Sequence, residues 1–278
     1  MMNATMKATA ILVVLAVALT GCGSDDDAVS DTTAPQTAAA TADESTAAAT
    51  PAVAGTITVS AAASLTGVFT TLEEAFTAAN PDATIDINFG SSGQLSTQIQ
   101  SGAPADLAAF ADEAPMAALD KAGLLAGPAE IFARNQLVIV TKPGNPKGIS
   151  SLADLATAGI ISLCADTAPC GKFANQALAS AAVSIPENSV TRGQDVKATL
   201  TAVAQGDAEA AIVYVTDAAA SGDSVATVEI PEADNVVAKY PIAVLGSTQN
   251  IELAEAFMAF VLSDDGQAAL GDAGFLSK

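Results

Sequence analysis

The alternation of two hydrophobic periods along residues 56–278 most restricts the fold of this chain. Short apolar runs with strand character are followed by segments whose apolar residues recur every three or four positions, the spacing of one buried helix face. The expected strands span residues 56–60, 84–89, 107–110, 137–141, 160–164, 210–215 and 236–245, and the clearest helices span 194–204 and 251–262. This order predicts an α/β fold with one large domain or two small lobes.

Serines stand at two of the predicted strand-to-helix junctions. Ser64 follows the strand at 56–60, and helical spacing begins directly after it, which makes Ser64 a candidate N-cap. Ser92 follows the strand at 84–89 in the same way. The free N–H groups and positive dipole end of such a helix start form a seat for an anion. A single serine here is most often an ordinary cap, but the pairing favours one shared anion site.

The first residues have the pattern of an export signal. Residues 1–21 contain one basic residue, Lys7, and an apolar run that is too short to span a bilayer. The quartet Leu19-Thr20-Gly21-Cys22 resembles a bacterial lipoprotein cleavage box. The resemblance implies that Cys22 becomes the first mature residue and carries the lipid. A retained transmembrane helix is the weaker alternative.

Residues 22–55 have the composition of a disordered tether. They consist almost wholly of Ala, Thr, Ser, Asp and Pro, without aromatic residues or apolar periodicity, so they cannot bury enough surface to become ordered. Three consecutive carboxylates at 25–27 raise the alternative of a metal site. On a flexible segment such a run is far more often solvated charge.

Composition excludes several classes of function. The chain contains no histidine, so Ser-His-Asp and Cys-His nucleophile systems and histidine metal sites are absent. Its 31 acidic and 10 basic residues repel nucleic-acid phosphates, and no Lys/Arg cluster offsets this repulsion. No nucleic-acid partner is therefore expected. The balance favours an exported, acidic protein that binds a small solute.

Six segments together resemble the molybdate-binding proteins of ABC transporters. They are AAASLT at 61–66, FGSSGQL at 89–95, SGAPADL at 101–107, Ala-Asp at 111–112, Gln-Asp-Val-Lys at 194–197 and IVYVTDA at 212–218. Each is weak alone, but they follow the family's order and spacing. The resemblance implies a two-lobed periplasmic-binding-protein fold of type II, in which each lobe is a mixed sheet flanked by helices. Residues 56–140 and 241–278 would form the first lobe, and residues 141–240 the second.

The resemblance also implies that the cleft between the lobes holds molybdate or tungstate, without any further cofactor. Ser64 and Ser92 would donate hydrogen bonds from the first lobe. Cys170 and Val196 would donate backbone N–H groups from the second lobe, and Tyr214 its phenol. The metal would thus be held only through its oxygens. Neutral donors and helix dipoles can offset the desolvation of a buried dianion.

The residues alone leave weaker interpretations open at this site. Val196 has the side chain of a core-facing helix residue, and Tyr214 that of a core or cleft-lining tyrosine with a local hydroxyl partner. Cys170 departs from the family, where a small residue such as alanine is expected. Gly93 stands where a third serine would be unsurprising, which affects the geometry of the first-lobe loop.

Partners and location follow from the same resemblance. It implies a monomeric binding protein, not an enzyme, which the Cys22 lipid anchors to the outer face of the cytoplasmic membrane and which delivers its ligand to an ABC transporter permease. One alternative is an enzyme with Ser64 as nucleophile, but no base is available by sequence. The other is a binding protein for sulfate or an organic acid. An organic acid usually requires an arginine, and the chain has only Arg134 and Arg192.

The cysteine count predicts a disulfide. With Cys22 taken by lipid, an exported protein is left with the pair Cys164 and Cys170. The alternative is two free thiols that are buried as small apolar residues.

Overall fold

Two groups of strands share one long strand in the computed structural model, which describes residues 53–278. The strand order is β2-β1-β3-β9-β4-β7-β5-β6, with β8 paired to β4. The strands are β1 (Gly55–Ala62), β2 (Ala83–Gly90), β3 (Leu107–Ala109), β4 (Glu130–Thr141), β5 (Ile161–Cys164), β6 (Val190–Gly193), β7 (Ala210–Tyr214), β8 (Ala226–Glu229) and β9 (Val237–Val244).

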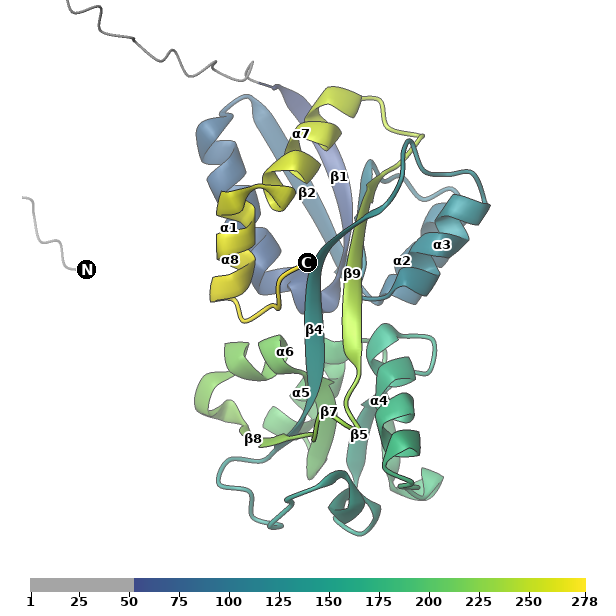
Figure 1. Ribbon diagram of the computed structural model, residues 1–278, viewed down its shortest axis with the longest axis vertical. Helices are drawn as coiled ribbons and strands as arrows, with labels where there is room; N and C mark the ends of the chain where they lie inside the picture. The colour runs from purple at the N-terminus through teal and green to yellow at the C-terminus, as the bar shows by residue number, and fades with distance from the viewer. Residues whose placement is uncertain (1–52) are drawn as a thin grey trace, which may run out of the picture. The chain divides into compact units, whose positions relative to one another are not determined.

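Helices cover both groups of strands. The α-helices are α1 (Thr66–Ala79), α2 (Ser92–Gln100), α3 (Glu113–Lys121), α4 (Pro169–Ser180), α5 (Val196–Ala204), α6 (Val215–Ala220), α7 (Ile251–Leu262) and α8 (Asp264–Asp272). Short 3₁₀ turns are η1 (Ala63–Leu65), η2 (Leu152–Ala156), η3 (Glu187–Ser189) and η4 (Gly222–Ser224). The first lobe contains β1–β3, α1–α3, α7 and α8, and the second contains β5–β8 and α4–α6 (Figure 1). The predicted two-lobed α/β fold is confirmed.

Strands β4 and β9 run side by side between the lobes (Figure 1). The first part of β4, from Glu130 to Gln136, pairs antiparallel with β9. From Leu137 to Thr141 the same strand pairs with β7 and β8 of the second lobe. The far end of β9 pairs with β3 of the first lobe. The backbone ladder is therefore continuous across the junction of the lobes.

Helix α1 shows how periodicity produces this packing. Its buried residues Val68, Phe69, Leu72 and Phe76 lie on one face, at the spacing of an amphipathic helix. The Phe76 ring packs edge-on against Phe257 of α7 with the ring centres 5.3 Å apart. Such aromatic contacts add to the apolar area that the first lobe buries.

Some local predictions were wrong. Ser64 is not the N-cap of α1, because the chain first makes the 3₁₀ turn η1 and α1 begins at Thr66. The side chain of Ser64 instead contacts Tyr240. Strand β4 begins at Glu130, earlier than predicted, because its first part contains the buried polar residue Asn135, which breaks the apolar pattern. Strands β6 and β8 were missed, since neither contains a buried apolar run like those of the equally short β3 and β5.

Candidate functional site

One small cavity at the junction of the lobes is lined by all five residues that the resemblance implied as ligand donors. Ser64 comes from η1 and Ser92 from α2 of the first lobe, whereas Cys170, Val196 and Tyr214 come from α4, α5 and β7 of the second. Each of the five is at most 6% exposed. The lobes therefore enclose the cavity between them.

Four α-helices, α2, α4, α5 and the short α6, begin at this cavity. Their N-cap residues Ser91, Ala168, Asp195 and Tyr214 all line it. Asp195 caps α5 with its carboxylate, which accepts from the Ala198 N–H at 2.9 Å. The starts of α2 and α4 have no side-chain cap. Their first N–H groups and dipoles are consequently available to an anion.

The sequence of α4 selects Cys170 as its first backbone donor. Pro169 occupies the first turn and has no N–H. The N–H groups of Gly171 and Lys172 both bond to the carbonyl of Ala168. The Cys170 N–H is thus the donor that α4 directs to the cavity, whatever its side chain is.

Two buried hydroxyls in the cavity wall have no hydrogen-bond partner within residues 53–278. They are the Oη of Tyr214 and the Oγ of Ser91. Buried polar groups nearly always have a partner, so this pair indicates a ligand that accepts hydrogen bonds. The role of Ser91 was missed in the sequence, where its only signal was its place beside Ser92.

The phenol of Tyr214 stays protonated here and can donate a hydrogen bond. Burial raises its pKa well above the usual value, and the nearby Tyr240, Asp217 and Asp112 add to this effect. The Tyr240 hydroxyl lies close enough to influence that pKa, but it does not make a hydrogen bond of acceptable geometry with Tyr214. A hydrogen bond requires alignment as well as proximity.

Ser92 retains a hydroxyl proton for the cavity, and in the contact between Ser64 and Tyr240 either hydroxyl can be the donor. The Oγ of Ser92 accepts from the Ala111 N–H at 3.0 Å. The Oγ of Ser64 lies 3.0 Å from the hydroxyl of Tyr240. A serine hydroxyl that accepts one bond can still donate another. Within the described part of the chain, the side chain that contacts the Ser64 hydroxyl is the phenol of Tyr240. A phenol is not a general base for Ser64, so the contact does not activate Ser64 as a nucleophile.

Two carboxylates near the cavity are paired with lysines, whereas Asp195 of the cavity lining makes no ion pair within residues 53–278. Lys172 of α4 contacts Asp112 of the first lobe at 2.7 Å, so this ion pair joins the lobes. Burial raises the pKa of Asp217, and the ammonium of Lys197, 2.9 Å from its Oδ1, opposes that rise. The carboxylate oxygens of Asp217 accept no well-aligned hydrogen bond within residues 53–278. The ion pair with Lys197 nevertheless compensates the negative charge of Asp217.

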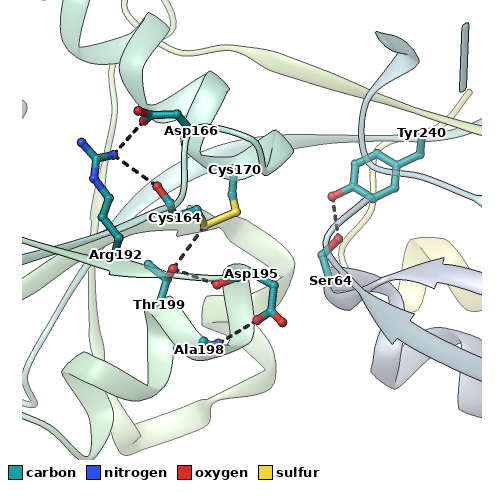
Figure 2. The surroundings of a disulfide bond; sticks show 9 residues. All are labelled: Ser64, Cys164, Asp166, Cys170, Arg192, Asp195, Ala198, Thr199 and Tyr240. Carbon is teal, nitrogen blue, oxygen red and sulfur yellow. Dashed lines mark hydrogen bonds and ion pairs between the residues drawn. A yellow bond between two sulfur atoms is a disulfide. The ribbon is translucent and has the colours of Figure 1, made fainter. Parts of the chain in front are cut away.

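Neither arginine lines the cavity. Arg192 pairs with Asp166 and Glu187 and also donates to the carbonyl of Cys164 (Figure 2). Arg134 donates to the carbonyl of Ser277. The guanidinium that an organic acid usually requires is therefore engaged elsewhere.

Cys164 and Cys170 form a disulfide, with their Cα atoms 5.7 Å apart (Figure 2). The bond connects the end of β5 to the first turn of α4, which carries the Cys170 N–H. Thr199 of α5 donates to the Sγ of Cys164 at 3.2 Å. The disulfide and its neighbours thus hold together the starts of α4 and α5, two of the second-lobe helices that begin at the cavity.

The fold and cavity define a two-lobed receptor for a small solute. The family model described as "Bacterial extracellular solute-binding protein" matches residues 57–276. The chain therefore belongs to the family of bacterial extracellular solute-binding proteins.

Individual relatives narrow the comparison. "Molybdate-binding protein ModA" of Mycobacterium tuberculosis is 42% identical over 223 residues, which cover 80% of this chain and 85% of that protein. "Putative ABC transporter substrate-binding lipoprotein YvgL" of Bacillus subtilis is 28% identical, with 80% and 87% covered. The solved periplasmic molybdate-binding protein of Azotobacter vinelandii has a TM-score of 0.73 at 23% identity, with 80% and 99% covered. At that identity the solved structure shows a shared fold.

The disulfide leads to a prediction about stability. Replacing both cysteines, as Cys164→Ala with Cys170→Ala, should lower the free energy of unfolding by about 2 kcal/mol, because the bridge closes only a short loop. Urea denaturation of the two proteins measures this difference. Reduction of the unaltered protein should cause a similar loss and add the mass of two hydrogens. Two thiols that react with an alkylating agent in non-reduced, folded protein would contradict the bridge.

Proposed function

We propose that this protein captures molybdate, or the similar anion tungstate, in the cavity between its lobes and delivers it to an ABC transporter permease. The observation that carries the proposal is the pair of buried, unpartnered hydroxyls of Ser91 and Tyr214 in the cavity wall. Hydroxyls without partners match a ligand whose surface consists entirely of acceptor oxygens. The molybdate-binding relatives support the same ligand.

The proposed site binds the anion through neutral groups. Ser64, Ser92 and Tyr214 would donate hydroxyl protons, and Cys170 and Val196 backbone N–H groups. No lysine or arginine belongs to the cavity lining that residues 53–278 form. Hydrogen bonds from neutral donors to a charged acceptor are strong, and uncapped helix starts add favourable dipoles. A tetrahedral dianion is thus compensated without a buried counter-ion.

Export and anchoring belong to the same proposal. The signal at 1–21, the tether at 22–55 and the lipid at Cys22 lie outside the described residues, apart from residues 53–55, and rest on the sequence pattern. The family is extracellular, and the Bacillus subtilis relative is named a lipoprotein. None of the helices in residues 53–278 has the length and apolar character needed to cross a bilayer. We propose a lipid-anchored monomer without enzymatic activity.

Anion selectivity tests the ligand directly. Calorimetric titration of the purified protein should give much tighter binding of molybdate than of sulfate, because fixed donors that fit the larger anion cannot all reach the smaller one. Tungstate, of similar size, should compete with molybdate for the same site. The absence of heat with molybdate, or equal affinities for molybdate and sulfate, would contradict the proposed ligand.

The Tyr214 hydroxyl offers a second test. Tyr214→Phe should weaken molybdate binding by about 1–3 kcal/mol, as expected for one hydrogen bond to a charged group. The same change should not lower the stability of the ligand-free protein, because the hydroxyl has no partner there. Titration and thermal unfolding measure the two effects separately. A loss of stability without a loss of affinity would assign the hydroxyl to the fold instead of the ligand.

Gly93 provides a test of lobe closure. A Cβ at this position would overlap the Thr167 carbonyl oxygen of the opposite lobe. Gly93→Ala should therefore hinder closure and weaken molybdate binding roughly tenfold or more, in line with the cost of overpacking. Small-angle scattering should show less compaction on adding molybdate.

Gly67→Ala is the matched control for this test, since an added Cβ there meets no atom within 4 Å. It should bind and close like the unaltered protein. Equal affinity of the two variants would show that closure does not depend on the space at Gly93.

A further inference from the structure

Four buried polar side chains form a chain of hydrogen bonds that ends at the cavity. They are Thr216 of α6, Asn135 of β4, Tyr240 of β9 and Ser64 of η1, none more than 6% exposed. The Nδ2 of Asn135 lies 2.8 Å from the Oγ1 of Thr216 and 3.4 Å from the Oη of Tyr240. The Oη of Tyr240 lies 3.0 Å from the Oγ of Ser64 (Figure 2). The chain thus runs from the second lobe, through both connecting strands, to the first lobe.

The backbone sets the direction of these hydrogen bonds. The N–H of Gln136 contacts the Oδ1 of Asn135 at 2.9 Å. An N–H can only donate, so this contact identifies Oδ1 as the acceptor and Nδ2 as the donor end of the amide. Asn135 therefore donates to the oxygen of Tyr240. The remaining proton of Tyr240 is then available to Ser64.

The surroundings of Tyr240 keep this proton in place. Its ring packs against the aromatic rings of Phe132, Tyr214 and Phe275, and the side chain is fully buried. Burial raises the pKa of Tyr240, and the phenol stays protonated. With the Asn135 amide occupying one side of its oxygen, the phenol donates to the Oγ of Ser64. Ser64, having accepted this bond, directs its own proton to another acceptor, and its side chain lines the cavity.

We propose that Tyr240 and Asn135 are positioning residues for the anion site, because they turn the Ser64 hydroxyl into a donor aimed at the ligand. The proposal rests on the function proposed above. It also explains why a strand that crosses between the lobes carries a buried asparagine, where an apolar residue would avoid the cost of desolvation. In this arrangement a ligand contact in the first lobe depends on both connecting strands.

A double-mutant cycle on molybdate affinity tests whether Asn135 and Tyr240 orient the Ser64 hydroxyl, an arrangement called the relay from here on. Tyr240→Phe removes only the relay hydroxyl and should weaken binding roughly threefold to tenfold, as expected for losing the orientation of one hydrogen bond. Ser64→Ala should weaken binding at least as much. Tyr240→Phe added to Ser64→Ala should then cause no further loss, because its effect passes through Ser64. Full, additive losses in the double variant would overturn the relay.

Tyr214→Phe is the matched control, because it is also a tyrosine-to-phenylalanine change at the cavity but acts on the ligand directly. It should weaken binding to a similar extent with and without Ser64→Ala. If its effect also disappeared in the Ser64→Ala background, the coupling would not be specific to Tyr240, and the relay would be overturned.

A second cycle, with Asn135→Ala in place of Tyr240→Phe, keeps the test independent of one variant's folding. Thermal unfolding of each ligand-free variant separates loss of structure from loss of orientation. Coupling of Asn135→Ala to Ser64→Ala supports the relay, and additivity overturns it.

If the unaltered protein binds no molybdate, both proposals fail. If it binds molybdate and the losses are additive, only the relay fails.

Discussion

The antiparallel pairing of β4 with β9 is the interaction on which the rest of the structure depends. It joins two sheets that would otherwise be separate, since β4 continues into the second lobe and β9 continues into the first. The cavity lies beside this junction, and both lobes contribute to its walls. The candidate site occupies this position.

Helix starts from both lobes meet at the cavity, and Asp195, a charged residue of its lining, caps α5. The uncapped start of α2 faces the uncapped start of α4, where Pro169 leaves Cys170 as the first donor. A rigid array of neutral donors is already oriented before a ligand arrives, which lowers the ordering cost of binding. The lysines nearby are already paired with Asp112 and Asp217, so the donors that remain at the cavity are neutral.

Ser64 and Ser92 could be predicted from strand-to-helix junctions with distinctive local sequence, whereas Cys170, Val196 and Tyr214 came from the resemblance to the molybdate-binding family. All five line one cavity. Other details could not be predicted. Ser64 was expected to cap a helix, but the tertiary contact with Tyr240 replaces that local bond. Ser91 could not be singled out, because only the folded chain leaves its hydroxyl buried without a partner.

The sequence by itself determined the α/β class, the absence of histidine chemistry and the alternation of strands with helices. These properties depend on composition and on short-range backbone geometry, which repeat within a few residues. Only the tertiary structure decided which hydroxyls have partners and which do not. Ser64 and Tyr240 are 176 positions apart, and Asn135 reaches Tyr240 across 105. No local pattern encodes such a meeting, because it exists only where β4 and β9 bring the two lobes together.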